Sequence, residues 1–176
     1  MTKDLTNSSV HRQNILNNPY ALQEIEKATR ISGIPFEGKS VVLKEQVAAF
    51  FEVTPRTVDN YIEKYGDELR RNGYEVIRGN RLKTLKLEIS ARGDNETDFV
   101  IKTNVLGIFD FRAFLNLAML MMESERARLL RQAILILAVW RAFSTLSGTT
   151  IITDLHRQAD TSFLLRVQFP LFSRRQ

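Results

Sequence analysis

A short polar segment that begins at Thr54 carries the side chains in this sequence that are best suited to contact nucleic acid. The residues predicted to face outward are Thr54, Arg56, Thr57, Asn60 and Lys64. In the major groove of DNA, arginine can make two hydrogen bonds to guanine, asparagine can make two to adenine, and threonine can meet a thymine methyl. Lysine and threonine also bind phosphate. A helix presenting these residues would have the chemistry to read double-stranded DNA.

Two helices would have to hold this segment, and the apolar residues around it are spaced for that arrangement. The residues expected between the two helices are Val47, Phe51, Val53, Val58 and either Tyr61 or Ile62. Helices that cross at about 90 to 120° also need a small residue where they approach most closely, and Ala48 can serve there. Residues 42–62 therefore predict a helix-turn-helix, whose second helix would point its N-terminal end into the major groove.

The second helix of this pair has a well-defined start at Thr54 and Pro55. The threonine hydroxyl can cap a free N–H group, and proline suits the first helical position. Glu52 occupies the turn position that glycine commonly takes, so we expect a longer or less tight turn. The same helix pair also occurs in proteins that bind no DNA, where the polar residues are simply solvated.

Residues 74–89 alternate in a way that predicts a β-hairpin directly after the second helix, with its turn at residues 78–81. The hairpin would carry Arg78, Arg81, Lys83 and Lys86, with no acidic residue among them. Placed like the wing of a winged helix, this cluster could follow the phosphate backbone and supply the salt-dependent share of affinity. The alternative is an exposed hairpin that its charges keep soluble.

Four acidic residues of the second helix oppose binding to a polyanion. They are Asp59, Glu63, Asp67 and Glu68. Because like charges repel each other, we expect these carboxylates to lie away from the phosphates of a bound duplex.

The fold predicted for the whole chain is mainly α with a small β-hairpin, a winged helix-turn-helix followed by a helical hairpin. We expect an N-terminal helical arm over 1–38, in which one helix is capped by Asn18, begins at Pro19 and ends before Gly33 and Pro35. The winged helix-turn-helix spans 39–102 and includes a short strand at 99–102. A helical hairpin over 103–143 has its corner at 123–126. Residues 144–176 form a tail with no clear period.

The composition favours a folded cytoplasmic protein with a polyanionic partner. The 176 residues carry a net charge of +5, and 44% of them are hydrophobic, which is typical of globular proteins. Cysteine is absent, the first residues are polar, and the most apolar run, 133–140, is too short to cross a bilayer. We therefore expect no membrane association.

The residue inventory argues against an enzyme and against a cofactor. His11 and His156 are the only histidines and have no metal-ligand spacing. The glycine-containing stretch at 147–150 lacks the lysine of a phosphate-binding loop. We predict no catalytic residues, no metal and no cofactor. A metal-dependent nuclease that relies on carboxylates is the enzymatic alternative left open.

The order of these parts resembles the bacterial and phage regulators grouped around the RhuM virulence protein and the Bro-N and KilA-N type domains. The resemblance covers about residues 39–135. It rests on residues 43–51 with 54–62, on Ile108-Phe109-Asp110-Phe111-Arg112-Ala113-Phe114, and on the arginine-containing stretch 124–132. It implies a DNA-binding regulator from a mobile element, a phage or a virulence-associated locus, and it does not imply an enzyme.

A second copy of the chain is the other expected partner. The helices of 103–143 carry many large side chains, including Met119, Met121, Met122 and Trp140. Some of that surface could be buried in a homodimer, which would pair two recognition helices about one DNA turn apart. A plain intramolecular core explains the same side chains equally well. The alternative function is a protein interaction or oligomerisation module whose helix-turn-helix binds no DNA.

Overall fold

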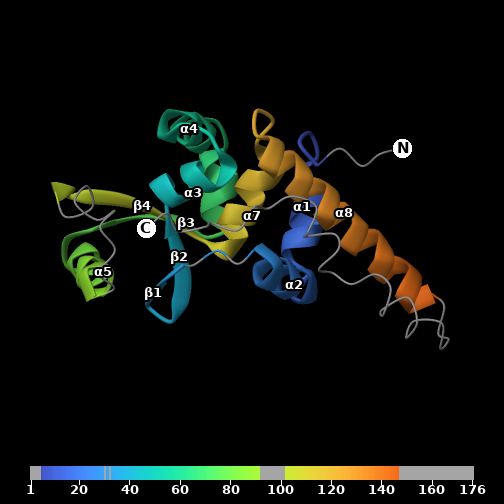
Figure 1. Ribbon diagram of the computed structural model, residues 1–176, viewed down its shortest axis with the longest axis horizontal. Helices are drawn as coiled ribbons and strands as arrows, with labels where there is room; N and C mark the ends of the chain where they lie inside the picture. Colours follow the sequence, from blue (N-terminus) through green and yellow to red (C-terminus); the bar gives the residue numbers. More distant parts are fainter. Residues whose placement is uncertain (1–4, 30, 32, 92–101, 147–176) are drawn as a thin grey trace, which may run out of the picture.

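The computed structural model describes residues 5–29, 31, 33–91 and 102–146, and places helices on both faces of a small antiparallel sheet (Figure 1). The helices are α1 (Ser9–Leu16), α2 (Pro19–Thr29), α3 (Lys44–Phe51), α4 (Pro55–Arg71), α5 (Gly79–Ala91), α7 (Phe111–Leu120) and α8 (Glu125–Leu146). The strands are β1 (Ile34–Phe36), β2 (Lys39–Leu43), β3 (Tyr74–Arg78) and β4 (Val105–Asp110). None of the described helices is both long and apolar enough to span a membrane.

The four strands run in the order β1-β2-β4-β3, and every neighbouring pair is antiparallel. Phe109 in β4 lies opposite both Val42 of β2 and Tyr74 of β3. Because side chains alternate between the two faces of a sheet, these three residues share one face, and they belong to the larger apolar core.

The larger core lies between that face of the sheet and helices α1, α2, α3, α4, α7 and α8. Helix α7 is central to it, since every residue from Ala113 to Leu120 is buried. The smaller core lies on the opposite face, where α5 covers the sheet with Leu82, Leu85 and Ile89. Figure 1 shows α5 on one side of the strands and α3 with α4 on the other.

The two helices predicted around residues 42–62 are present as α3 and α4. Val47, Ala48 and Phe51 of α3 are buried, as is Val58 of α4. Thr54 caps α4, with Pro55 as its first residue, as the sequence predicts. Residues 41–43, just before the pair, belong to strand β2.

Helix α4 bends at Tyr65, whose φ of −121° and ψ of 21° are not helical. The glycine that follows, Gly66, is buried. The segment from Pro55 to Lys64 is therefore a straight rod of its own, and the remainder of α4 runs on in another direction toward β3.

The β-hairpin predicted over 74–89 is wrong. Strand β3 does form at Tyr74–Arg78, but its partner is β4, and Gly79–Ala91 is helix α5. The buried residues Leu82, Leu85 and Ile89 recur every three or four positions, which is a helical period. Leu87, which would face the core in the predicted strand, is 72% exposed.

The N-terminal arm holds the predicted helix from Pro19, preceded by a separate helix α1. Its end differs from the prediction, because β1 begins at Ile34 and pairs with β2. Glu37 and Gly38 join the two strands with φ values of 49° and 77°. Positive φ at both central residues is the signature of a two-residue type I′ hairpin turn.

The helical hairpin predicted over 103–143 is present as α7 and α8, with Asp110 accepting a hydrogen bond from the Ala113 N–H group as the cap of α7. Its first residues differ, since 105–110 form β4. Of the short strand predicted at 99–102 and the tail at 144–176, all but Lys102 and residues 144–146 lie outside the described residues.

Candidate nucleic-acid interface

The leading end of α4 is exposed and held in a fixed geometry. Thr54 and Pro55 are exposed, and the Thr57 N–H group donates to Thr54 Oγ1 over 3.1 Å. The two threonine hydroxyl oxygens lie 2.9 Å apart. The first turn contains no acidic residue. The positive end of the helix dipole therefore faces solvent without an acidic side chain beside it in this turn.

Arg56, Asn60 and Lys64 follow one another at intervals of four along the straight part of α4, and all three are exposed. Residues four apart lie on the same side of a helix, so these three of the five predicted contact residues share one outward stripe, whereas Thr57 is half-buried. The Lys64 ammonium lies 5.0 Å from the centre of the Tyr65 ring. Among the described residues, Arg56 takes part in no salt bridge and no side-chain hydrogen bond.

Three of the four acidic residues of α4 form salt bridges with basic residues, two of them with partners outside the helix. Lys44 Nζ lies 2.9 and 3.1 Å from the carboxylate oxygens of Asp59, and Glu68 is held by Arg12. The other two, Glu63 and Asp67, are exposed, and Asp67 pairs with Arg70 at 3.1 Å. Among the described residues, Glu63 is therefore the one acid in the first part of α4 without a salt-bridge partner, and it lies on the same helix as Arg56 and Lys64.

The turn between α3 and α4 is tight, contrary to the longer turn expected from Glu52. Glu52 adopts the left-handed conformation, with φ of 54° and ψ of 42°. The Val53 N–H group closes the turn by donating to Ala48 O over 3.0 Å. The Glu52 carboxylate also forms a salt bridge with Arg126, in which Arg126 Nη2 lies 2.7 Å from Glu52 Oε1.

The basic residues predicted for the wing are divided between the two faces of the sheet. Arg78 is exposed at the end of β3 and shares the α4 side with Tyr74, because they are four positions apart on one strand. Lys83 is exposed on α5, on the other side of the sheet. Lys86, also on α5, donates to Thr103 O over 2.6 Å. Arg78, but not Lys83, therefore lies on the face of the sheet that α4 covers.

Arg81 is engaged by carboxylates of the protein itself. It donates to both oxygens of Glu37, over 2.7 and 2.6 Å, and to Glu75 over 3.0 Å. The hydrogen bonds that Arg81 donates to Glu37 and, to a smaller extent, to Glu75 raise the pKa of Arg81 above its ordinary value. In turn, the hydrogen bond from Arg81 lowers the pKa of Glu37. The Arg81 guanidinium therefore ties α5 to the β1–β2 turn and to β3.

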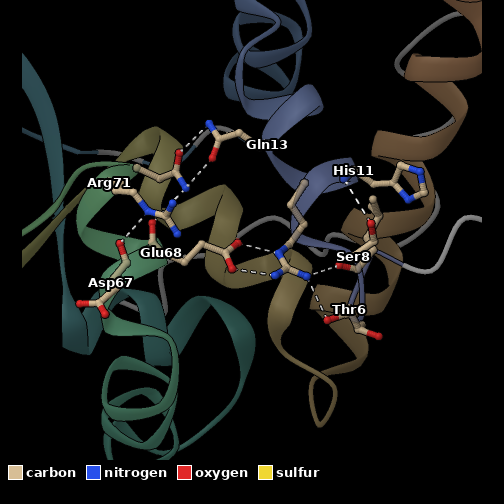
Figure 2. Close-up of polar contacts among 10 residues, drawn as sticks. Thr6, Ser8, His11, Gln13, Asp67, Glu68 and Arg71 are labelled. Atoms are coloured by element: carbon tan, nitrogen blue, oxygen red, sulfur yellow. Dashed lines mark hydrogen bonds and ion pairs between the residues drawn. The ribbon is translucent and has the colours of Figure 1, made fainter.

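A polar network that the sequence did not reveal joins α1 to the end of α4. Arg12 is 3% exposed and donates to both carboxylate oxygens of Glu68 over 2.7 Å. It also donates to the main-chain oxygens of Leu5 and Thr6. Figure 2 shows Glu68 reaching from α4 toward α1, with Gln13 of α1 in a second set of contacts nearby. Arg12 lies in a polar stretch of sequence, so no pattern marked it as buried.

His11, one of the two residues considered as a possible catalyst, lies on α1, where its main-chain N–H group donates to Ser8 Oγ over 3.3 Å. Figure 2 shows His11 beside Ser8. In the described ranges, no three His, Cys, Asp or Glu residues lie together in a way that could hold a metal ion. His156 lies outside these ranges.

The chain was also compared with known proteins. The comparisons with protein families, with curated proteins and with solved structures found no match.

Proposed function

We propose that this protein binds double-stranded DNA sequence-specifically through the N-terminal part of α4. The observation that carries the proposal is the exposed stripe of Arg56, Asn60 and Lys64 on a rod whose first turn has no acid and whose cap, Thr54, faces solvent. A helix end of this kind suits the major groove, since arginine and asparagine match the edges of guanine and adenine.

The order of elements around α4 supports a winged helix as the framework. Strand β2 directly precedes α3, and β3 directly follows α4 in the sequence. In the sheet, β3 pairs with β4. In this proposal, the β3–β4 ribbon would serve as the wing in place of the predicted hairpin. Arg78, on the α4 side of this ribbon, is the proposed phosphate contact there. Arg81 forms salt bridges with Glu37 and Glu75, which balance its charge. Its side chain is therefore poorly placed to bind a phosphate.

The proposed biological role is that of a cytoplasmic transcriptional regulator from a mobile element, a phage or a virulence-associated locus, acting as a homodimer. A dimer would place two copies of α4 on neighbouring half-sites, about 34 Å apart. Sedimentation of the protein alone and of its complex with DNA tests this part. A monomer in the first sample and one protomer on each duplex in the second would contradict it.

Selection of bound duplexes from a random pool tests whether the protein binds DNA sequence-specifically. The full chain is expected to enrich a common sequence and to bind it at least about a thousand times more tightly than random duplex at physiological salt. Equal affinity for selected and random duplexes would refute sequence-specific binding. Cleavage of the duplex in the presence of Mg²⁺ would favour the nuclease alternative instead.

A further inference from the structure

The corner between α7 and α8, defined here as residues 122–126, lies against the helix-turn-helix. It is far from α3 and α4 in sequence, yet contacts both helices and the turn between them. From this corner α8 runs away from the helix pair, past α1 and α2, to its end at Leu146 (Figure 1).

The corner satisfies the last main-chain oxygens of α3. Ser124, which is 3% exposed, donates through its hydroxyl to Phe51 O over 2.6 Å. Arg126 Nη1 donates to Phe50 O over 3.0 Å. The final carbonyls of a helix have no partner within it. Here side chains more than seventy residues later in the chain supply those partners and fix where α3 ends.

The same arginine holds the turn. Arg126 Nη2 lies 2.7 Å from Glu52 Oε1, and the Arg126 side chain is only 16% exposed. Glu52 is in the left-handed conformation that non-glycine residues rarely adopt. A backbone state of this kind persists only where its surroundings determine it strongly. Arg126 belongs to those surroundings, because it contacts both Phe50 at the end of α3 and Glu52 in the turn.

The corner also forms hydrogen bonds with α4, the proposed recognition helix. The Tyr61 hydroxyl donates to Glu123 Oε2 over 2.6 Å and accepts from the Met122 N–H group over 3.0 Å. Burial, together with the hydrogen bond to Glu123, raises the pKa of Tyr61 to about 12. Tyr61 follows Asn60 directly, so this contact fixes the rotation of the stripe that carries Arg56 and Asn60.

We propose that the α7–α8 corner sets the angle and rotation of the recognition helix, so that Glu123, Ser124 and Arg126 are positioning residues for reading DNA sequence without touching DNA. This inference rests on the proposed function. It follows from the geometry because one five-residue segment holds the end of the first helix, the turn and the second helix together. Reading of base edges depends on such placement, because misplacement of about 1 Å weakens bidentate contacts.

Arg126→Met tests the proposal, and Arg128→Met is the matched control. Arg128 lies on the same helix but pairs only with Glu125 of its own first turn among the described residues. We expect Arg126→Met to lower the ratio of affinity for the selected duplex to affinity for random duplex by about tenfold, because base contacts need the fixed angle while phosphate contacts do not. Arg128→Met should leave that ratio unchanged.

Amide hydrogen exchange of the free protein gives a readout that needs no DNA. In Arg126→Met, exchange in residues 50–61 should quicken while the buried amides of α7 stay protected. Arg126→Lys, which keeps the charge facing Glu52, should recover part of both effects. If the parent selects no duplex, the proposed function fails, and the exchange result still decides whether the corner holds the helix pair.

Tyr61→Phe provides a second variant that removes one hydroxyl and keeps the ring. Like Arg126→Met, it should lower the specificity ratio, which is the affinity for the selected duplex divided by that for random duplex. This test remains possible if Arg126→Met does not fold. The proposal is overturned if both Tyr61→Phe and any folded Arg126 variant show the parent's specificity ratio and the parent's exchange in residues 50–61.

Discussion

Arg56 and Arg81 show how the surroundings of a residue decide its role. Both are exposed arginines of the same basic chain. Arg81 lies between Glu37 and Glu75, and its guanidinium also stacks 5.6 Å from the centre of the Phe36 ring. Arg56 forms no salt bridge with a carboxylate in the described part of the molecule. Sequence shows the charges of both but not the partners, because Glu37 is distant in the chain and is aimed by a hairpin turn.

Arg81→Met should lower the stability of the protein in a pH-dependent way. Because the folded-state pKa of Glu37 lies below its ordinary value of 4.5, its stabilising effect is present above that pH and is lost as the pH falls through the folded-state pKa. Urea unfolding should therefore show the parent and Arg81→Met differing at neutral pH and converging below pH 4.5. Lys83→Met, on the same helix, is the control and should match the parent at every pH.

The buried pair Arg12–Glu68 allows a second prediction at this scale. Arg12→Met leaves the Glu68 carboxylate, whose side chain is 13% exposed, without its partner. Removing one member of a buried pair costs about 3–5 kcal/mol, whereas replacing both by apolar residues costs much less. Arg12→Met with Glu68→Met should therefore recover most of the free energy of unfolding lost in Arg12→Met. Equal losses in the single and double variants would show that the charge pairing is unimportant.

At the scale of elements, Thr54 caps the start of α4 and is also one of the proposed DNA contacts. Thr54→Ala removes the cap and should cost about 1 kcal/mol of stability. Thr54→Asp and Thr54→Asn both keep a capping oxygen, so thermal unfolding should place them near the parent. Only the aspartate should weaken DNA binding, because its charge would face the phosphates. If Thr54→Asp and Thr54→Asn bind duplex equally well, the start of α4 does not approach DNA.

The helices with strong signals could be predicted from the sequence, and those with mixed signals could not. Thr54-Pro55 and the apolar spacing from Val47 to Val58 specify α3 and α4 locally. Residues 82–89 contain leucines that fit either a strand or a helix, and the choice is made by the sheet face that α5 covers. The pairing of β3 with β4 is equally invisible, because the partner strand lies beyond α5 and residues 92–101.

At the scale of the whole molecule, the candidate site depends on contacts between distant parts of the chain. The α7–α8 corner holds the turn at Glu52, α1 holds the end of α4 through Arg12, and α5 closes the opposite face of the sheet. The outward residues of α4 could be predicted because they follow from its own period. The residues that position α4 could not, because their partners are brought close only by folding.

The central claim is that Arg56 reads a base from the leading end of α4. The most direct measurement is the affinity of Arg56→Ala for the duplex selected by the parent and for versions of it with one base pair changed. The variant should lose about 1–3 kcal/mol on the selected duplex and should no longer distinguish one of its base-pair positions. Arg71→Ala, at the far end of α4, should keep that discrimination. Parent-like affinity and discrimination in Arg56→Ala would contradict the claim.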